Sequence, residues 1–230
     1  AKNGFFKIYD LSDEQFILNG RIPQANNDYV VEILFNQDNT KLILCTFKGD
    51  IFVYVAPTYR EIKFKMQLQM MVTSMKLAPF LVDTIGVTTE DGKLLIIDLS
   101  EGTIKANFQG YHIGTVTGLT FSPVSKVFLC SCGLDGKAVF YDIEKKKLVT
   151  SIETNAPLTS VSFHHDGAQL LLGDADGRIL LYNIRETSSP KFILSGNKGR
   201  INCIVVNKVN TRHLSSSGIN NQSVSNKQSN

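Results

Sequence analysis

The sequence predicts an all-β protein built from one four-stranded antiparallel unit that is repeated along the chain. Three observations support this prediction. A turn pair recurs at a nearly constant interval, an alternating apolar strand follows each turn, and no stretch has the apolar periodicity of a long helix. The composition, with 43% hydrophobic and 20% charged residues, is that of a globular chain.

The repeat is visible first in its turns. Turn pairs occur at Asn3-Gly4, Gly49-Asp50, Asp91-Gly92, Asp135-Gly136 and Asp176-Gly177, about 41 to 45 residues apart, which is the blade period of a WD40-type β-propeller. Because glycine accepts the positive φ of a tight hairpin, each pair marks a connection between two strands. The strand that follows each turn ends at about the same position of the repeat. These strand ends are Tyr9-Asp10, Tyr54-Val55, Ile97-Asp98, Tyr141-Asp142 and Tyr182-Asn183.

One period, from His112 to Glu153, shows the whole unit. We expect its strands at 116–122, 127–132, 137–143 and 148–152. Complete units are predicted over about 28–70, 71–109, 113–153 and 157–195. A strand pair at 5–11 and 15–22 precedes them, and a single strand at 201–206 follows them.

Residues 60–71 contain three methionines among lysines and glutamines, a composition that suggests a helix. Their pattern has a period of two, however, since Ile62, Phe64, Met66, Leu68 and Met70 alternate with polar residues. Such alternation places the two sets on opposite faces of a strand. We therefore predict the outer strand of a blade here.

An open stack of blades exposes a long pairing edge, which a closed ring removes. We therefore expect the chain to be part of a larger propeller of seven blades whose N-terminal blades precede Ala1, with the strand at 201–206 completing a blade begun by them. The propeller is predicted over 1–206. Residues 207–230 are rich in Asn, Ser and Gln and are predicted to be a disordered polar linker.

Several function classes are disfavoured by the composition. The net charge of +3 lacks the basic excess of nucleic-acid binders, and no apolar run is long enough to span a membrane. The four cysteines lack zinc-site spacing and are interpreted as reduced core residues of a cytosolic or nuclear protein: Cys45, Cys130, Cys132 and Cys203. We interpret His164-His165-Asp166 as a solvated turn, and predict no catalytic residue, metal or cofactor.

The third unit resembles a WD40 repeat in more than its period. Such repeats often contain a hydrogen-bonded set of His, Ser or Thr, Asp and Trp, and the matching residues here are His112, Ser131, Asp135 and Tyr141, with tyrosine in place of tryptophan. The chain has no Trp, and the other units keep little beyond the turns, so the repeats are divergent. The blade-turn residues are Asp91, Gly92, Gly136, Asp176 and Gly177.

Several longer motifs point to one family. They are His112-Ile113-Gly114-Thr115, Phe121-Ser122-Pro123-Val124, Gly133-Leu134-Asp135-Gly136-Lys137, Ala156-Pro157-Leu158-Thr159 and Asp166-Gly167-Ala168. This sequence resembles, most densely over 112–206, the WD40 propeller of the neural-precursor-expressed, developmentally down-regulated family of centrosomal adaptors. The resemblance implies a cytoplasmic, non-catalytic scaffold that takes the γ-tubulin ring complex to centrosomes and the spindle for microtubule nucleation, with augmin-like factors as partners. In that family a C-terminal helical segment, absent here, holds the nucleator.

Two alternatives stay open. Tyr182-Asn183-Ile184-Arg185 is similar to the W-D-x-R motif of WD40 substrate receptors of cullin-4 ubiquitin ligases, with Arg185 as the contact residue. A structural ciliary or coat propeller would have the same fold. Lys145, Lys146 and Lys147 are either an acidic-partner site or an ordinary solvated hairpin.

Overall fold

The computed structural model describes residues 5–10, 15–21, 28–56, 58–59, 62–196 and 198–207. Within these ranges the chain forms 18 β-strands, arranged as four four-stranded antiparallel sheets and one hairpin. The described residues include no helix, so none that could cross a membrane. The all-β prediction is confirmed.

Each sheet, or blade, consists of four strands that are consecutive in the chain. Blade 1 contains β3 (Val30–Phe35), β4 (Lys41–Thr46), β5 (Asp50–Val55) and β6 (Ile62–Gln67). Blade 2 contains β7 (Val72–Leu77), β8 (Thr84–Thr89), β9 (Leu94–Asp98) and β10 (Thr103–Phe108). Blade 3 contains β11 (Val116–Phe121), β12 (Phe128–Gly133), β13 (Lys137–Asp142) and β14 (Lys147–Glu153). Blade 4 contains β15 (Leu158–Phe163), β16 (Gln169–Asp174), β17 (Arg178–Asn183) and β18 (Phe192–Ser195), and β1 (Phe5–Asp10) pairs with β2 (Gln15–Arg21).

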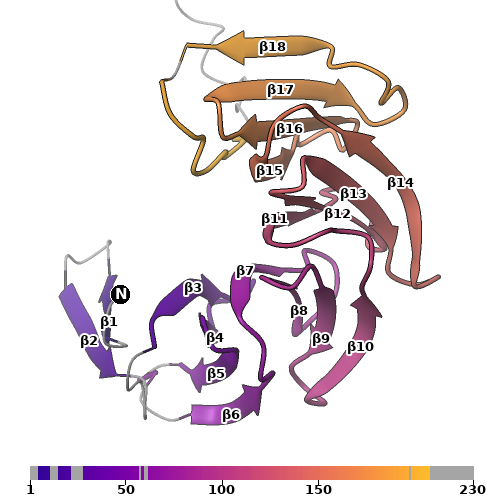
Figure 1. The fold of residues 1–230 in the computed structure, drawn as a ribbon. Helices are drawn as coiled ribbons and strands as arrows, with labels where there is room; N and C mark the ends of the chain where they lie inside the picture. The colour runs from indigo at the N-terminus through magenta and orange to yellow at the C-terminus, as the bar shows by residue number, and fades with distance from the viewer. Residues whose placement is uncertain are drawn as a thin grey trace, which may run out of the picture.

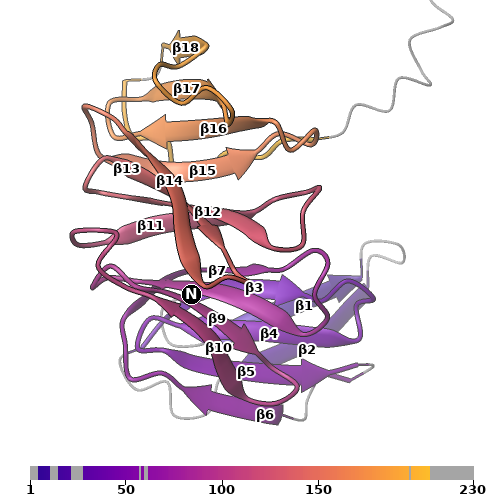
Figure 2. The same ribbon diagram turned by 90° about the vertical axis from the view of Figure 1, so that its right-hand side faces the viewer.

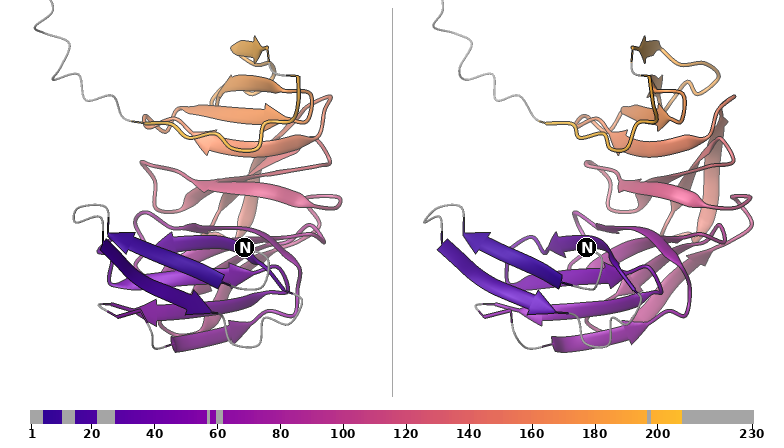
Figure 3. Two further views of the ribbon diagram at one scale, coloured as in Figure 1. Left: turned by 90° about the vertical axis from the view of Figure 1, so that its left-hand side faces the viewer. Right: turned by 60° about the vertical axis from the view of Figure 1, so that its left-hand side comes forward.

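The blades follow one another around an arc, with the β1–β2 hairpin at one end and blade 4 at the other (Figure 1). The first strand of each blade lies on the concave side and the fourth on the outside, and the side views in Figures 2 and 3 show the blades stacked face to face. The first strands contact one another in the order β3, β7, β11 and β15. This radial arrangement is that of a β-propeller, as the sequence predicted.

The core lies between neighbouring blades. One face of β12 and β13 packs against blade 4 through residues such as Cys130 and Phe140. The opposite face packs against blade 2 through residues such as Leu129 and Tyr141. Because both faces of the middle strands are covered, the central residues of β12 and β13 are all buried, whereas the outer strand β6 alternates between half-buried and exposed residues. The predicted methionine-containing strand is confirmed over Ile62–Gln67.

Glycines with positive φ close the tight turn between the second and third strand of every blade: Gly49 (φ +89°), Gly92 (+88°), Gly136 (+76°) and Gly177 (+84°). Gly49 in blade 1 occupies the same position of the turn as Gly136 in blade 3. The turn pair of blade 1 is therefore Lys48-Gly49, and the predicted pair Gly49-Asp50 was one residue out of register. A Cβ on Gly136 would lie 2.8 Å from the Thr154 carbonyl oxygen. The turn therefore requires glycine for its packing as well as its φ.

The predicted strand at 201–206 was wrong, because residues 201–207 form no strand. The segment still lies beside blade 4, since the Ile201 amide donates to the Asp174 carbonyl (3.0 Å) and the Ile201 carbonyl accepts from Thr159 Oγ1 (2.6 Å). No described residue supplies an antiparallel neighbour on its other side, and a ladder needs one.

Cys203 in this segment is exposed, so its predicted core position was also wrong, whereas Cys45, Cys130 and Cys132 are buried free thiols as expected. The predicted linker lies outside the described residues beyond Asn207.

Candidate functional site: the third blade

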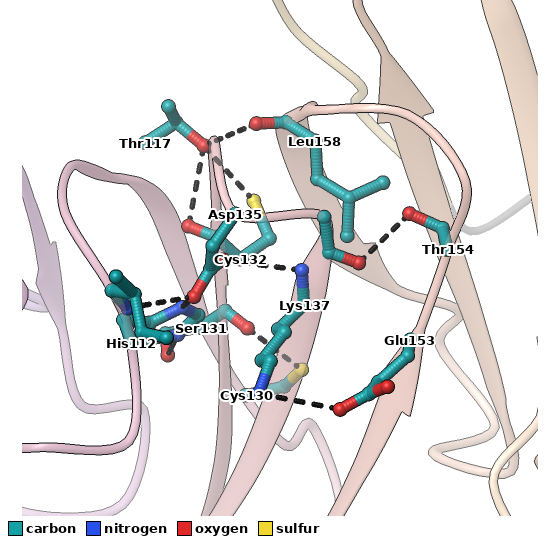
Figure 4. A network of polar contacts seen from close by, with 12 residues as sticks. His112, Thr117, Cys130, Ser131, Cys132, Asp135, Lys137, Glu153, Thr154 and Leu158 are labelled. Atoms are coloured by element: carbon teal, nitrogen blue, oxygen red, sulfur yellow. Dashed lines mark hydrogen bonds and ion pairs between the residues drawn. The ribbon is translucent and has the colours of Figure 1, made fainter.

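The structure brings together His112, Ser131, Asp135 and Tyr141 in blade 3. His112 Nδ1 lies 3.1 Å from each carboxylate oxygen of Asp135, and its Nε2 lies 2.8 Å from the Ser131 hydroxyl (Figure 4). The Ser131 hydroxyl is hydrogen-bonded to the Tyr141 hydroxyl at 3.2 Å. Asp135 also accepts from the backbone amides of Ile113 (2.9 Å) and Lys137 (3.1 Å). The network thus ties the β10–β11 connection to the β12–β13 turn and the middle of the blade.

Burial fixes the protonation of this network. The His112 side chain has no exposed surface, and desolvation lowers its pKa below the ordinary 6.5 although Asp135 acts in the opposite direction. The ring is therefore neutral at pH 7, with the proton on Nδ1 because the carboxylate can only accept. Desolvation likewise raises the pKa of the Tyr141 hydroxyl and raises that of the Cys132 thiol to about 12. These protonated groups suit a structural network better than nucleophilic chemistry.

The other blades replace this network with different contacts. In blade 4 the buried Asp174 accepts from the backbone amide of Arg178 at 2.8 Å and from its Nε at 2.6 Å. The predicted turn residue Asp176 is largely exposed, and its Oδ2 lies 3.2 Å from Arg178 Nη2. In blade 2, Asp91 accepts from Thr89 Oγ1 at 2.6 Å. The sequence analysis missed Asp174, whose only signal is an arginine four residues later.

A second feature that the sequence analysis missed joins the blades along their inner edge. The second residue of the innermost strand is a threonine in three blades, and its hydroxyl donates to the carbonyl of the first residue in the next blade or segment. The three pairs are Thr73 to Val116 (2.5 Å), Thr117 to Leu158 (2.8 Å) and Thr159 to Ile201 (2.6 Å). The partners are separated by 43, 41 and 42 residues. The signal in the sequence is a threonine at the repeat period.

Blade 1 has Val31 at this position and uses a charged contact instead. Glu32 accepts from the Ser74 hydroxyl (3.2 Å) and the Met75 amide (2.9 Å), and it pairs with Lys76. Thr73, Thr117 and Thr159 with Glu32 and Cys203 line a hollow of about 330 Å³ on the concave side. The described residues contain no group of three or more His, Cys, Asp or Glu arranged for a metal ion.

The other candidate residues lie apart from the network, at the opposite ends of the strands. Lys145 and Lys146 are exposed in the β13–β14 hairpin, and Lys147 begins β14. Arg185 is exposed beyond β17, where its backbone amide donates to Asn183 Oδ1 at 3.0 Å. His164 lies in the β15–β16 turn with Nδ1 at 3.0 Å from Asp166 Oδ2.

Comparison with known proteins agrees with this geometry. The family model "WD domain, G-beta repeat" matches residues 102–142 and 146–183, which include blade 3 and most of blade 4. The chain is 27% identical over 203 residues to Protein NEDD1 of Homo sapiens, covering 88% of this chain and 30% of that protein. It is 32% identical over 149 residues to Protein NEDD1 of Bos taurus, covering 65% and 22%. A shorter match, 28% over 78 residues, is to U3 small nucleolar RNA-associated protein 21 of Saccharomyces cerevisiae, covering 34% and 8%.

The four blades and the two matched repeats identify the fold as that of a WD40-type β-propeller, a class of protein-interaction scaffold. Over much of its length the chain is similar to Protein NEDD1 from humans and from cattle. The chain spans less than a third of the length of these relatives.

Proposed function

We propose that this chain is the targeting platform of an adaptor that takes the γ-tubulin ring complex to centrosomes and the spindle for microtubule nucleation. The similarity to human Protein NEDD1 over 88% of the chain is the observation that carries the proposal, together with the family resemblance of the motifs around blade 3. In this proposal the propeller extends to residue 206 and binds centrosomal or augmin-like proteins. A polar linker from 207 leads to a separate region that holds the nucleator.

A platform of this kind needs rigidity more than chemistry. Neighbouring blades share an apolar core, and the threonine hydroxyls join their inner strands. The His112 to Tyr141 network holds one blade together, and its protonated, buried groups leave no activated nucleophile there. Binding then falls to the exposed turns and outer strands, as in interfaces that use a few anchoring side chains. The proposed role is therefore non-catalytic.

The proposal is tested by affinity purification of the longer protein that contains this segment, from dividing cells. We expect γ-tubulin to copurify. The 230-residue chain alone, tagged with a fluorescent protein, is expected to accumulate at centrosomes without recovering γ-tubulin. A destabilised blade 3, as in Ser131→Ala combined with Tyr141→Phe, is expected to weaken the localisation.

The cullin-4 alternative makes a different prediction in the same experiment. Recovery of the ligase adaptor and its loss in Arg185→Ala, with no γ-tubulin, would overturn the proposal. Recovery of γ-tubulin that Arg185→Ala leaves unchanged would support it.

A further inference from the structure

Blade 3 presents unpaired positive charge at the hairpin between β13 and β14. Lys145 lies 3.7 Å from Asp142, but within the described ranges no carboxylate oxygen lies within 4.0 Å of the Lys146 or Lys147 ammonium group. The Val127 carbonyl accepts from the Ile143 amide at 2.8 Å, which brings the exposed Lys126 alongside the same hairpin. Lys126 also forms no ion pair with any of the described residues. Four lysines therefore share one end of the blade, against the carboxylates of Asp142 and Glu144.

The backbone of this hairpin is strained at Lys146, which has φ +52°. The equivalent residue in blade 2 is Gly102, with φ +68°, and both turns are capped by the preceding aspartate, Asp98 or Asp142. The equivalent residue in blade 1, Tyr59, has φ +49° but is buried and donates its hydroxyl to the Asn39 carbonyl at 2.6 Å. Among the described residues, the Lys146 side chain has no hydrogen-bond partner of this kind. The turn therefore presents a lysine at a position where the equivalent turn of blade 2 has a glycine.

Apolar side chains lie directly beside these charges. Leu148 and Val149 of β14 are 38% and 50% exposed. Val149 occupies a β-bulge, because Tyr141 pairs with Leu148 and Phe140 pairs with Thr150. The residues at the same bulge in blades 1 and 2 are Lys63 and Lys105. Among the three blades, blade 3 alone combines a basic turn with an apolar bulge residue.

β14 is also the outermost strand of its sheet, so one edge of its backbone has no strand partner. Such an edge offers amide and carbonyl groups to an added extended peptide. The lysines complement carboxylates on that peptide, and the exposed Val149 and Leu148 complement an apolar side chain. A polyphosphate backbone matches the surface less well, because it contacts neither the apolar residues nor the strand edge and requires a larger basic field.

We propose that the β13–β14 hairpin, together with Lys126 and the exposed edge of β14, is a docking site for an acidic peptide segment of a partner protein that carries an apolar side chain next to its carboxylates. The site deepens the proposed scaffold function and rests on it, since it specifies the chemistry of one partner.

The test is fluorescence anisotropy of the 230-residue chain with a labelled glutamate-rich peptide that contains one phenylalanine. The main variant combines Lys145→Gln, Lys146→Gly and Lys147→Gln. Since an exposed ion pair contributes a factor of about two to five in affinity, we expect this variant to bind roughly ten- to a hundred-fold more weakly. The matched control, Lys63→Gln with Lys65→Gln and Lys105→Gln, removes the same charge from the outer strands of blades 1 and 2 and is expected to bind like the parent.

A second variant separates the apolar contribution from charge. Val149→Ser is expected to weaken the phenylalanine peptide about three- to ten-fold and to leave a peptide with serine in place of phenylalanine unchanged. Thermal melts of each variant check that it is folded.

The proposal is overturned if the control variant loses as much affinity as the main variant, or if single-stranded DNA competes as well as the peptide does. Copurification of γ-tubulin is measured separately. If γ-tubulin does not copurify but the peptide still binds, the proposed nucleation role is contradicted and the docking site is not.

Discussion

The Thr117 hydroxyl donates a hydrogen bond of 2.8 Å to the Leu158 carbonyl, and this bond joins the innermost strand of blade 3 to that of blade 4. The same hydroxyl lies 3.2 Å from the Cys132 carbonyl of its own blade. One side chain thus links two strands of blade 3 with the next blade. Since Thr73 and Thr159 do the same one period away, the inner edge is held by a repeated polar contact in addition to the apolar core.

Thr117→Val is expected to lower the free energy of unfolding by about 1 to 2 kcal/mol, because the shape is kept but a part-buried carbonyl loses its donor. Chemical denaturation followed by circular dichroism measures this. Thr103→Val on the exposed outer strand β10 is the control and should change the free energy of unfolding by less than about 0.5 kcal/mol. Equal effects of the two substitutions would show that the inter-blade bond has no special role.

Ser131→Ala is expected to destabilise the chain by about 1 to 3 kcal/mol, since it leaves His112 Nε2 and the Tyr141 hydroxyl without a partner in a buried site. Tyr141→Phe removes only one end of the network and should cost less. The double variant should cost less than the sum of the two single changes, because the Ser131–Tyr141 contact is lost once. Strict additivity in denaturant titrations would contradict the network.

The pH dependence of stability follows from His112. Its pKa is lowered in the folded protein, so between that value and 6.5 the unfolded chain binds the proton and the folded chain does not. The stability that depends on the neutral ring is therefore present above pH 6.5 and is lost as the pH falls toward the folded pKa. We expect the parent to lose more stability than His112→Gln between pH 7 and pH 5, when both are measured by urea titration at each pH. His165→Gln, at an exposed turn, is the control, and it should retain the pH dependence of the parent.

Lys146→Gly is expected to raise the free energy of unfolding by about 1 kcal/mol, because glycine adopts the positive φ of this position without a Cβ penalty. The reciprocal change, Gly102→Ala in blade 2, is expected to destabilise the protein. Gly102 has φ +68°, and a Cβ at this position would lie 2.9 Å from a ring carbon of Phe64. Melting temperatures of both variants check the pair. A lower melting temperature for Lys146→Gly would show that the lysine makes a stabilising contact.

Much of the fold was predictable because its signals are local. The alternation of Ile62, Phe64 and Met66 and the glycine of each turn depend on a few neighbouring residues, and the observed strands begin and end within a few residues of the predicted positions. The candidate network was also found, since His112, Ser131, Asp135 and Tyr141 match a known pattern of spacing. Predictions failed where an element depends on a distant partner, as for the strand at 201–206, whose pairing requires another strand beside it.

The sequence by itself determined that this protein is a series of four-stranded units with glycine turns, because hairpin geometry and side-chain alternation are properties of short stretches of chain. Only the tertiary structure decided how the units join. The bond from Thr117 to Leu158 spans 41 residues, and the burial of Cys130 against blade 4 depends on how two separate sheets pack. Likewise, the strain at Lys146 and the exposure of Val149 emerged only once the hairpin was placed at the outer edge of its blade, where no neighbouring blade covers it.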